Sequence, residues 1–403
     1  MQKLSKLMLA AVAAIALATP AMAWDFSAAG SVSATFNMAS TKDSNFDNIT
    51  NSTSVFQGDT GSISLKSSHA DGDDTVAMTY TVDYDTDTDG DAGLGIETTM
   101  TLAGSTKVGN WTASATAAQS IQDGDDSAAS KGATDADTAA ITLTDGTMTH
   151  KLGKAAHLAS PSLASASGAV GGNQAAGANT GSHTGYSLGV ALSDTMSVTL
   201  AIDMDSGTDP ECLGGSDHHA AALASDNVDS TCFGVNLAGS ADALAYSVSI
   251  GSGSSSDDNS TRGSSGSSSV MGFAVSYALG SGTIAFDYAT ESVSGKTDST
   301  VTNARKYEDV EMEISYVHNL GDDSVVVNYS TNSTATTAEG TATADKPTID
   351  TGIEIGYKTT VGAVTLEAGY GMNSATDADD TSATSTVSGE TDSDIGVKLA
   401  YSF

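Results

Sequence analysis

The sequence predicts an all-β fold: a transmembrane antiparallel β-barrel of eighteen strands, with sixteen as the alternative count. Three observations predict it: apolar and polar residues alternate along most of the chain, short turns alternate with long polar segments, and the last residue is aromatic. Alternation with a period of two is typical of a strand with one apolar and one polar face. Eight short turns and nine long loops give eighteen strands, and an even count with both chain ends on the turn side fits a single-chain barrel.

The final strand shows the pattern most clearly. Between residues 393 and 403 the apolar residues Ile395, Val397 and Leu399, followed by Tyr401 and Phe403, alternate with small or charged residues. This ending resembles the closing strand of bacterial outer-membrane β-barrels. The resemblance implies that Tyr401 and Phe403 form an assembly signal for the barrel-assembly machinery.

The beginning of the chain is typical of an exported protein. Lys3 and Lys6 precede an apolar run over residues 7–17, and a small-residue cleavage site follows at 21–23. We therefore expect a signal peptide at 1–23 and a barrel domain at 24–403. No later window approaches the roughly 20 apolar residues of a spanning helix, so any membrane crossing is expected to use strands.

Composition excludes some functions and leaves others open. Fifty acidic residues against 15 basic ones give a formal net charge of −35, which argues against a nucleic-acid partner. An acidic chain with few aromatics is also typical of disorder, but the regular alternation argues against that interpretation. A secreted β-rich adhesin or surface-layer protein would alternate too. Every tyrosine except Tyr307 falls on the apolar face, where a barrel can place it at a membrane interface.

The short connections are predicted from glycine and aspartate. The strongest hairpin signal is Asp145-Gly146 between two alternating segments. The expected turns lie at 70–74, 104–109, 145–146, 193–195, 239–242, 280–282, 319–323 and 359–362.

Residues 146–154, Gly-Thr-Met-Thr-His-Lys-Leu-Gly-Lys, resemble the strand before the constriction loop in the general porins of Gram-negative bacteria. The resemblance implies a homotrimeric, water-filled diffusion channel in the bacterial outer membrane, with one loop folded inward. By this match the inward loop is 154–184, which contains no Asp or Glu. Strict counting makes it the fourth long loop, and the third, at 120–137, is acidic. Either the barrel has two extra strands or the hairpin at 95–118 is over-split.

An enzyme is not expected. Gly295-Lys296-Thr297 ends like a phosphate-binding loop, but Thr290 stands where that motif needs glycine. The histidines are scattered singly, which is typical of solvated side chains. An outer-membrane lipase or protease would need a nucleophile and base that converge in space.

Two loops suggest additional chemistry. Carboxylates at alternate positions, Asp85, Asp87, Asp89 and Asp91, resemble the start of a calcium loop, although Ile96 occupies the position of the closing acid. One interpretation is a solvated acidic loop. The other is structural calcium, which would also link the acidic exterior to lipopolysaccharide phosphates. In another loop Cys212 and Cys232 are expected to form a disulfide, because the chain is exported to an oxidising compartment.

Strand parity predicts which charged residues line the pore. The acids exceed the lysines, so we expect a cation-preferring channel for small hydrophilic solutes, with a substrate-specific channel as the alternative. Three of the lysines, at 66, 358 and 398, are expected to form a basic wall near barrel closure. Small residues on the first strand, Ala28, Gly30 and Ala34, are expected to let a neighbouring barrel approach. The predicted pore-lining residues are Asp83, Glu97, Asp203, Asp287, Glu311, Glu313, Glu354, Glu367, Lys66, Lys151, Lys358 and Lys398.

Overall fold

The structure is a computed structural model of the 403-residue chain. It describes residues 24–42, 48–86, 94–122, 138–155, 183–207, 228–257, 265–296, 303–337, 347–377 and 390–403. Within these ranges no helix has the length and apolar character needed to cross a membrane.

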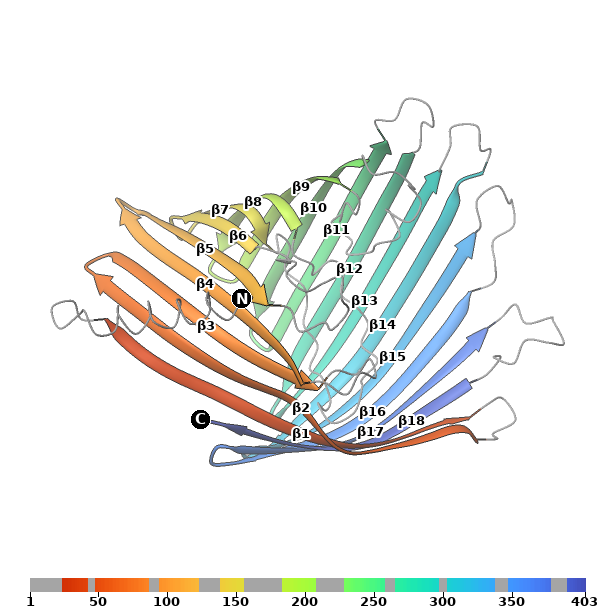
Figure 1. Ribbon diagram of the computed structural model, residues 1–403. Helices are drawn as coiled ribbons and strands as arrows, with labels where there is room; N and C mark the ends of the chain where they lie inside the picture. The colour runs from red at the N-terminus through yellow and green to blue at the C-terminus, as the bar shows by residue number, and fades with distance from the viewer. Residues whose placement is uncertain are drawn as a thin grey trace.

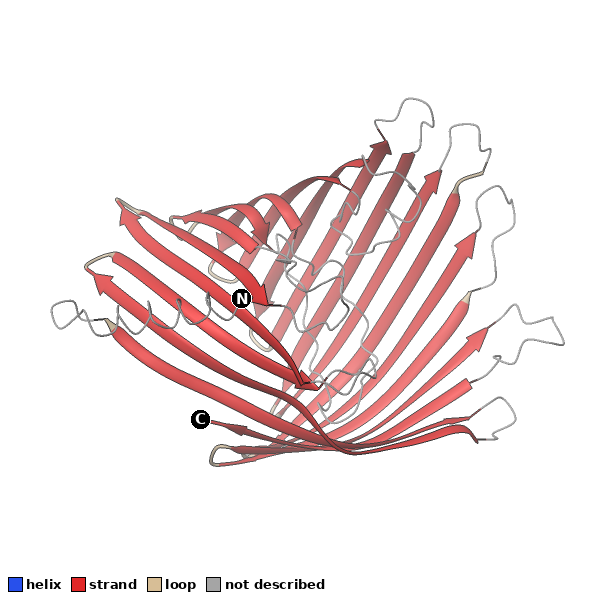
Figure 2. Ribbon diagram, viewed as in Figure 1, coloured by secondary structure: helices blue, strands red, loops and turns tan. Residues whose placement is uncertain are grey.

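The described residues form a single sheet of eighteen strands (Figure 2). Most strands are 11 to 16 residues long, while β6 and β7 are the shortest, with 7 and 8 residues. The strands are β1 (Asp25–Lys42), β2 (Asn48–Asp71), β3 (Asp74–Thr86), β4 (Leu94–Val108), β5 (Trp111–Gln122), β6 (Thr138–Thr144), β7 (Met148–Ala155), β8 (His183–Ser193), β9 (Met196–Gly207), β10 (Val228–Ala241), β11 (Leu244–Asp257), β12 (Ser265–Leu279), β13 (Gly282–Lys296), β14 (Arg305–Leu320), β15 (Asp323–Thr337), β16 (Thr348–Val361), β17 (Val364–Asp377) and β18 (Glu390–Ser402).

The sheet closes on itself into a barrel. Each strand pairs antiparallel with the next, and β1 pairs antiparallel with β18 in a register that sets Val32 opposite Tyr401. Figure 1 shows β1 in red and β18 in blue side by side along the lower edge. Closure leaves no unpaired sheet edge, so every backbone group of the wall can find a partner within the sheet.

Eight short turns join the strands in pairs, as predicted. β4 and β5 are separate strands that pair from Thr98 to Val108, so the eighteen-strand count is confirmed and the sixteen-strand alternative is wrong. Six of the predicted turns begin inside a strand, by the most at 104–109, 239–242 and 359–362; Gly104 and Gly239, for example, belong to β4 and β10. A Cβ at Gly239 would lie 2.5 Å from the hydroxyl of Tyr246 on the neighbouring strand, so any larger residue would require the Tyr246 ring to move.

The two faces of the wall have the opposite exposure from a water-soluble protein. Large apolar side chains on the outer face are open, as at Ile141 and Phe233, each 58% exposed. Polar side chains on the inner face are buried, as at Glu313 and Asn328, with 0% and 2% exposed. An apolar exterior on a closed barrel requires lipid around it, so the secreted-adhesin interpretation is wrong.

Aromatic groups gather on the outer face close to the short turns. Trp24 stacks on His69 with ring centroids 5.4 Å apart, and Trp111 lies 5.8 Å from His150. Nδ1 of His150 is hydrogen-bonded to the hydroxyl of Tyr186 at 2.7 Å. Amphipathic rings on the outer face near the ends of the strands are typical of the interfacial girdle of a membrane barrel.

Candidate functional site

The inner wall of the barrel carries most of the residues predicted from parity. Register pairing sets residues on adjacent strands opposite each other and therefore on one face. In this way Asp83 on β3 lies opposite Glu97 on β4, and Asp203 on β9 lies opposite Cys232 on β10. The side chains of Glu97 and Asp203 lie outside the described part of the chain, so only their backbone positions are known.

One part of this wall is strongly acidic. Asp287 on β13 is the register partner of Glu313 on β14, and Glu291 is the partner of Asp309 on the same two strands. Glu311 on β14 is the register partner of Asn332 on β15, and Asn332 is in turn the partner of Asp350 on β16. We call this cluster the acidic patch; its members are Asp287, Glu291, Asp309, Glu311, Glu313, Asp350 and Glu354.

Polar side chains on β15 support the loop-side half of the acidic patch. The amide of Asn332 donates to Oε1 of Glu311 at 3.3 Å, and the hydroxyl of Thr334 donates to Oδ1 of Asp309 at 2.8 Å. These donors satisfy carboxylate oxygens while leaving their negative charge in place. Asn332 and Thr334 therefore hold the carboxylates of Glu311 and Asp309 in place on the inner wall.

The predicted basic wall is interrupted by an acid. Lys358 on β16 and Lys398 on β18 are both register partners of Glu367 on β17. Nζ of Lys358 lies 2.9 Å from Oε1 of Glu367. The pairings of β17 with β16 and with β18 therefore place Glu367, itself a predicted pore-lining residue, between the two lysines of the expected basic wall.

The other two predicted lysines lie apart from this row. Lys66 on β2 is the partner of Thr79, and Lys151 on β7 is the partner of Thr142 and Ser187. These neighbours carry hydroxyl groups and no charge. The positive charge of the wall is thus divided among separate positions, whereas the acids of β13 to β16 are concentrated.

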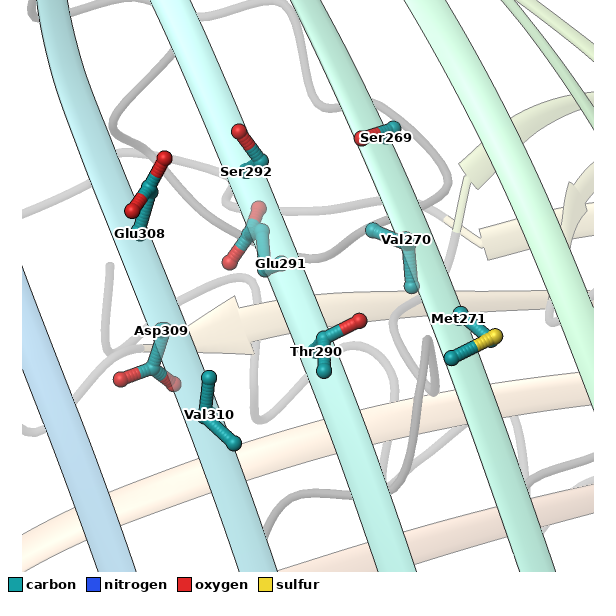
Figure 3. Close-up of a pocket in the computed structure, with 9 residues that line it drawn as sticks. All are labelled: Ser269, Val270, Met271, Thr290, Glu291, Ser292, Glu308, Asp309 and Val310. Carbon is teal, nitrogen blue, oxygen red and sulfur yellow. The ribbon is translucent and has the colours of Figure 1, made fainter.

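A small cavity adjoins the loop-side part of the acidic patch. Its volume is about 250 Å³, and its lining comes from β12, β13 and β14 (Figure 3). Three acidic residues, Glu291, Glu308 and Asp309, are among those that line it. The described residues include no group of three His, Cys, Asp or Glu side chains arranged to hold a metal ion.

Sequence reasoning missed Glu291, Asp309 and Asp350. Each has the same parity as a predicted pore acid on its own strand, namely Asp287, Glu311 or Glu354. The apolar residues used to set parity end before these positions, since the loop-side ends of the strands become polar on both faces. Extending the parity by one to three residues beyond the apolar residues of each strand would have found them.

Several predicted features lie outside the described residues. These are the signal peptide at 1–23, both candidate constriction loops beyond their flanking strands, and most of the calcium loop at 85–91. Cys232 is buried, with 1% exposed, and is disulfide-bonded. Cys212 is not among the described residues, so its pairing with Cys232 stays a prediction.

The small residues on β1 have a different use from the one expected. The ring of Phe403 covers Gly30, at the place where a neighbouring barrel was expected to approach. Backbone hydrogen bonds of 2.9 Å join the two residues in both directions. Gly30 therefore serves closure within one chain, while the approach of a neighbouring barrel at Ala28 and Ala34 stays a prediction.

No protein-family model and no curated protein matches the chain. Three solved structures share its fold. The outer membrane channel DcaP of Acinetobacter baumannii matches with a TM-score of 0.52 and 12% identity, over 96% of this chain and 99% of that one. An anion-selective porin from Comamonas acidovorans matches with a TM-score of 0.51 and 13% identity, over 94% of this chain and 100% of that one. OpdL of Pseudomonas aeruginosa matches with a TM-score of 0.50 and 9% identity, over 94% of this chain and 99% of that one.

The likeness extends over nearly the full length of all four chains, while the identities are low. Together with the open apolar exterior and the polar interior, it establishes the architecture. The chain has the fold of the outer-membrane porins and channels, a closed barrel of eighteen antiparallel strands that crosses a bacterial outer membrane.

Proposed function

We propose that this protein is a porin: a passive channel through the bacterial outer membrane for small hydrophilic solutes and ions, with a preference for cations, and not an enzyme. The observation that carries the proposal is the acidic patch on the inner wall of a closed eighteen-strand barrel. Barrels of 16–18 strands leave an aqueous lumen. Fixed carboxylates beside that lumen raise the local concentration of cations.

Charge distribution supports the sign of the selectivity. Lys358 is paired with Glu367, so its positive charge is partly compensated. The acidic patch has no matching lysine in its own register rows on β13, β14 and β15. Ordinary salt has a Debye length of about 8 Å, so wall charges act on ions within a narrow lumen and lose influence as salt increases. The expected channel thus contrasts with the anion-selective porin of similar fold.

Reversal potential across a KCl gradient tests the proposal. A planar bilayer containing the wild-type protein should give the sign of potassium preference, and the preference should weaken as the mean salt concentration rises. Replacement of Glu311 and Glu313 by glutamine should move the reversal potential towards that of an unselective pore. A chloride-preferring wild-type channel contradicts the proposal.

Glu308 provides the matched control on the same strand. It is exposed and has the opposite parity from Glu311 and Glu313, so its side chain belongs to the outer face. Glu308→Gln removes the same charge within a few residues but outside the lumen. Its reversal potential should equal that of the wild type, which separates a lumen effect from a general change in protein charge.

A substrate-specific channel is the second candidate. Register places Tyr307 on the inner face, while the other tyrosines of the described strands lie on the outer face with the apolar residues. The described inner wall thus shows no extended aromatic path for sugars, which favours a general channel. Concentration-dependent block of the current by one sugar would favour the specific channel instead.

The homotrimer is part of the same proposal, and so is contact with lipopolysaccharide. The outer face offers apolar surface around the whole barrel, which fits lipid and neighbouring barrels alike. Electrophoresis of unheated, detergent-extracted protein tests the assembly. A trimeric mass that falls to the monomer on heating is expected, and a monomeric mass before heating contradicts the trimer.

A further inference from the structure

We propose that Asp287, Glu313 and Asn328 form a binding site for one calcium ion on the inner wall, separate from the acidic loop at 85–91. Asp287 and Glu313 are register partners on β13 and β14. Asn328 on β15 is the partner of Ser315, so it lies diagonally next to Glu313. Diagonal neighbours are within reach of long side chains, and all three share the inner face.

The two carboxylates are enclosed to an unusual degree. Asp287 is 1% exposed and Glu313 is 0% exposed, and Oδ1 of Asp287 accepts no hydrogen bond from any described residue. Two like charges directly opposite each other repel, and an ionised carboxylate taken out of water carries a large desolvation cost. A cation bound between the two groups removes both penalties.

Asn328 is a second and independent sign of a missing partner. Its side chain is 2% exposed, and neither Oδ1 nor Nδ2 makes a hydrogen bond with the described part of the chain. Buried amides are almost always satisfied, so one with both ends unused points to a partner of another kind. An amide oxygen beside two carboxylates is a normal ligand set for calcium.

The neighbours of Asp287 and Glu313 across the sheet are short, while Asn328 also faces Glu354 on β16, a buried acid of the same patch. Ala274 on β12 faces Asp287, Ala285 and Ala289 flank it on β13, and Ser330 on β15 faces Glu313. All four are buried and short. None of these four side chains carries a charge.

Charge and geometry select a divalent ion. Two carboxylates carry a charge of −2, which one divalent cation balances. Calcium takes carboxylate and amide oxygens in flexible geometry and completes its shell with water, whereas magnesium demands near-ideal octahedral positions. Three protein ligands spread over three strands fit the more tolerant ion.

Calorimetric titration of the chelator-treated protein in detergent micelles tests the site, with calcium chloride as the probe. The wild type should bind calcium, and its thermal midpoint should rise. Asp287→Asn and Glu313→Gln should each weaken this binding by about tenfold or more, since calcium affinity follows the number of charged ligands. Asn328→Asp adds a carboxylate and should tighten the binding, which keeps the test informative if another variant folds poorly.

Two controls separate this site from other acids. Glu308→Gln should leave the titration unchanged, and Asp87→Asn with Asp89→Asn should remove only binding by the acidic loop. Equal calcium binding by the wild type, Asp287→Asn and Glu313→Gln overturns the proposal. Binding is measured without conduction, so failure here leaves the proposed channel function intact.

Discussion

Gly30 and Phe403 close the barrel by exchanging two backbone hydrogen bonds, each 2.9 Å long. They continue the ladder in which Ser31 faces Ser402 on β1 and β18. The aromatic ring of Phe403 occupies the space that a Cβ of residue 30 would fill. Such a Cβ would also lie 2.8 Å from the carbonyl oxygen of Ser62. Closure of the barrel thus depends on the absence of a side chain at Gly30 and on the aromatic side chain of Phe403.

Gly30→Ala should therefore destabilise the closed barrel. The added methyl group meets the Phe403 ring on one side and the rigid backbone at Ser62 on the other, so the seam between β1 and β18 must shift. Overpacking of this kind lowers the free energy of unfolding by about 1–3 kcal/mol. The thermal midpoint, followed by heat-modifiable migration on a gel, should fall.

Gly104→Ala is the matched control for this prediction. Gly104 also lies within a strand, but the nearest atom to an added Cβ is the carbonyl oxygen of Thr75 at 3.4 Å, an ordinary contact. Its midpoint should stay close to that of the wild type. Equal midpoints for the two variants would show that the seam tolerates a methyl group.

Phe403→Ala should lower the yield of folded protein in the outer membrane. The ring of Phe403 lies 6.0 Å from that of Tyr401, and the two form the aromatic end expected to act as the assembly signal. Val361→Ala, at an exposed turn position, removes apolar surface elsewhere and serves as the control. Fractionation followed by immunoblotting measures the yield, and an undiminished level for Phe403→Ala argues against the signal.

Asp145 stabilises the turn between β6 and β7. Its carboxylate accepts hydrogen bonds from the backbone N–H of Met148 at 2.7 Å and of Thr147 at 2.9 Å, and these bonds hold the pKa of Asp145 below its usual value. A lowered pKa in the folded state means that this stabilisation is present above the carboxyl range and is lost as pH falls. Asp145→Asn should lower the urea midpoint at pH 7.

The pH dependence checks the cause of that effect. When the carboxyl group of the wild type is protonated it resembles asparagine as a weaker acceptor, so the two proteins should converge at a pH well below the usual carboxyl range. Urea midpoints at neutral and acidic pH give the comparison. A difference that is independent of pH would mean that the charge of Asp145 is not the cause.

Lys358 and Glu367 should have opposite effects on selectivity. Lys358→Met removes the partner of Glu367, and Glu367→Gln leaves two lysines facing a neutral residue. The first variant should increase cation preference and the second should reduce it, as measured by reversal potential. Because Lys358 is half exposed, the cost in stability should be at most about 1 kcal/mol. Shifts of the same sign in both variants would contradict this assignment.

Cys232 should be joined to Cys212. Mass spectrometry of a non-reduced digest of the exported protein should contain the crosslinked peptide. A loop of this size contributes roughly 3 kcal/mol in the chain-entropy model, so Cys232→Ser should lower the unfolding midpoint. Reduction of the wild type should have the same effect, while two free thiols before reduction refute the crosslink.

The sequence by itself determined the number of strands in the barrel wall and the face to which their side chains point. A strand has a side-chain period of two, so the parity of Ile395, Val397 and Leu399 assigns the outer face without knowledge of any neighbour. Gly and Asp at the short turns fix where strands end, and Asp145-Gly146 was located to the residue. Both kinds of information are local, which is why the eighteen strands and the inward direction of Glu311 and Glu313 were predictable.

Only the tertiary structure decided which inward residues meet. The register between neighbouring strands and the stagger of the closed barrel depend on pairings over the whole chain, including that of β1 with β18. This is why parity placed Glu367 on the inner face but did not set it directly opposite both Lys358 and Lys398. It is also why Gly30 was assigned to a neighbouring barrel instead of to Phe403. The pairing of Asp287 with Glu313 has the same origin: parity places each acid on the inner face, but register alone sets them opposite each other.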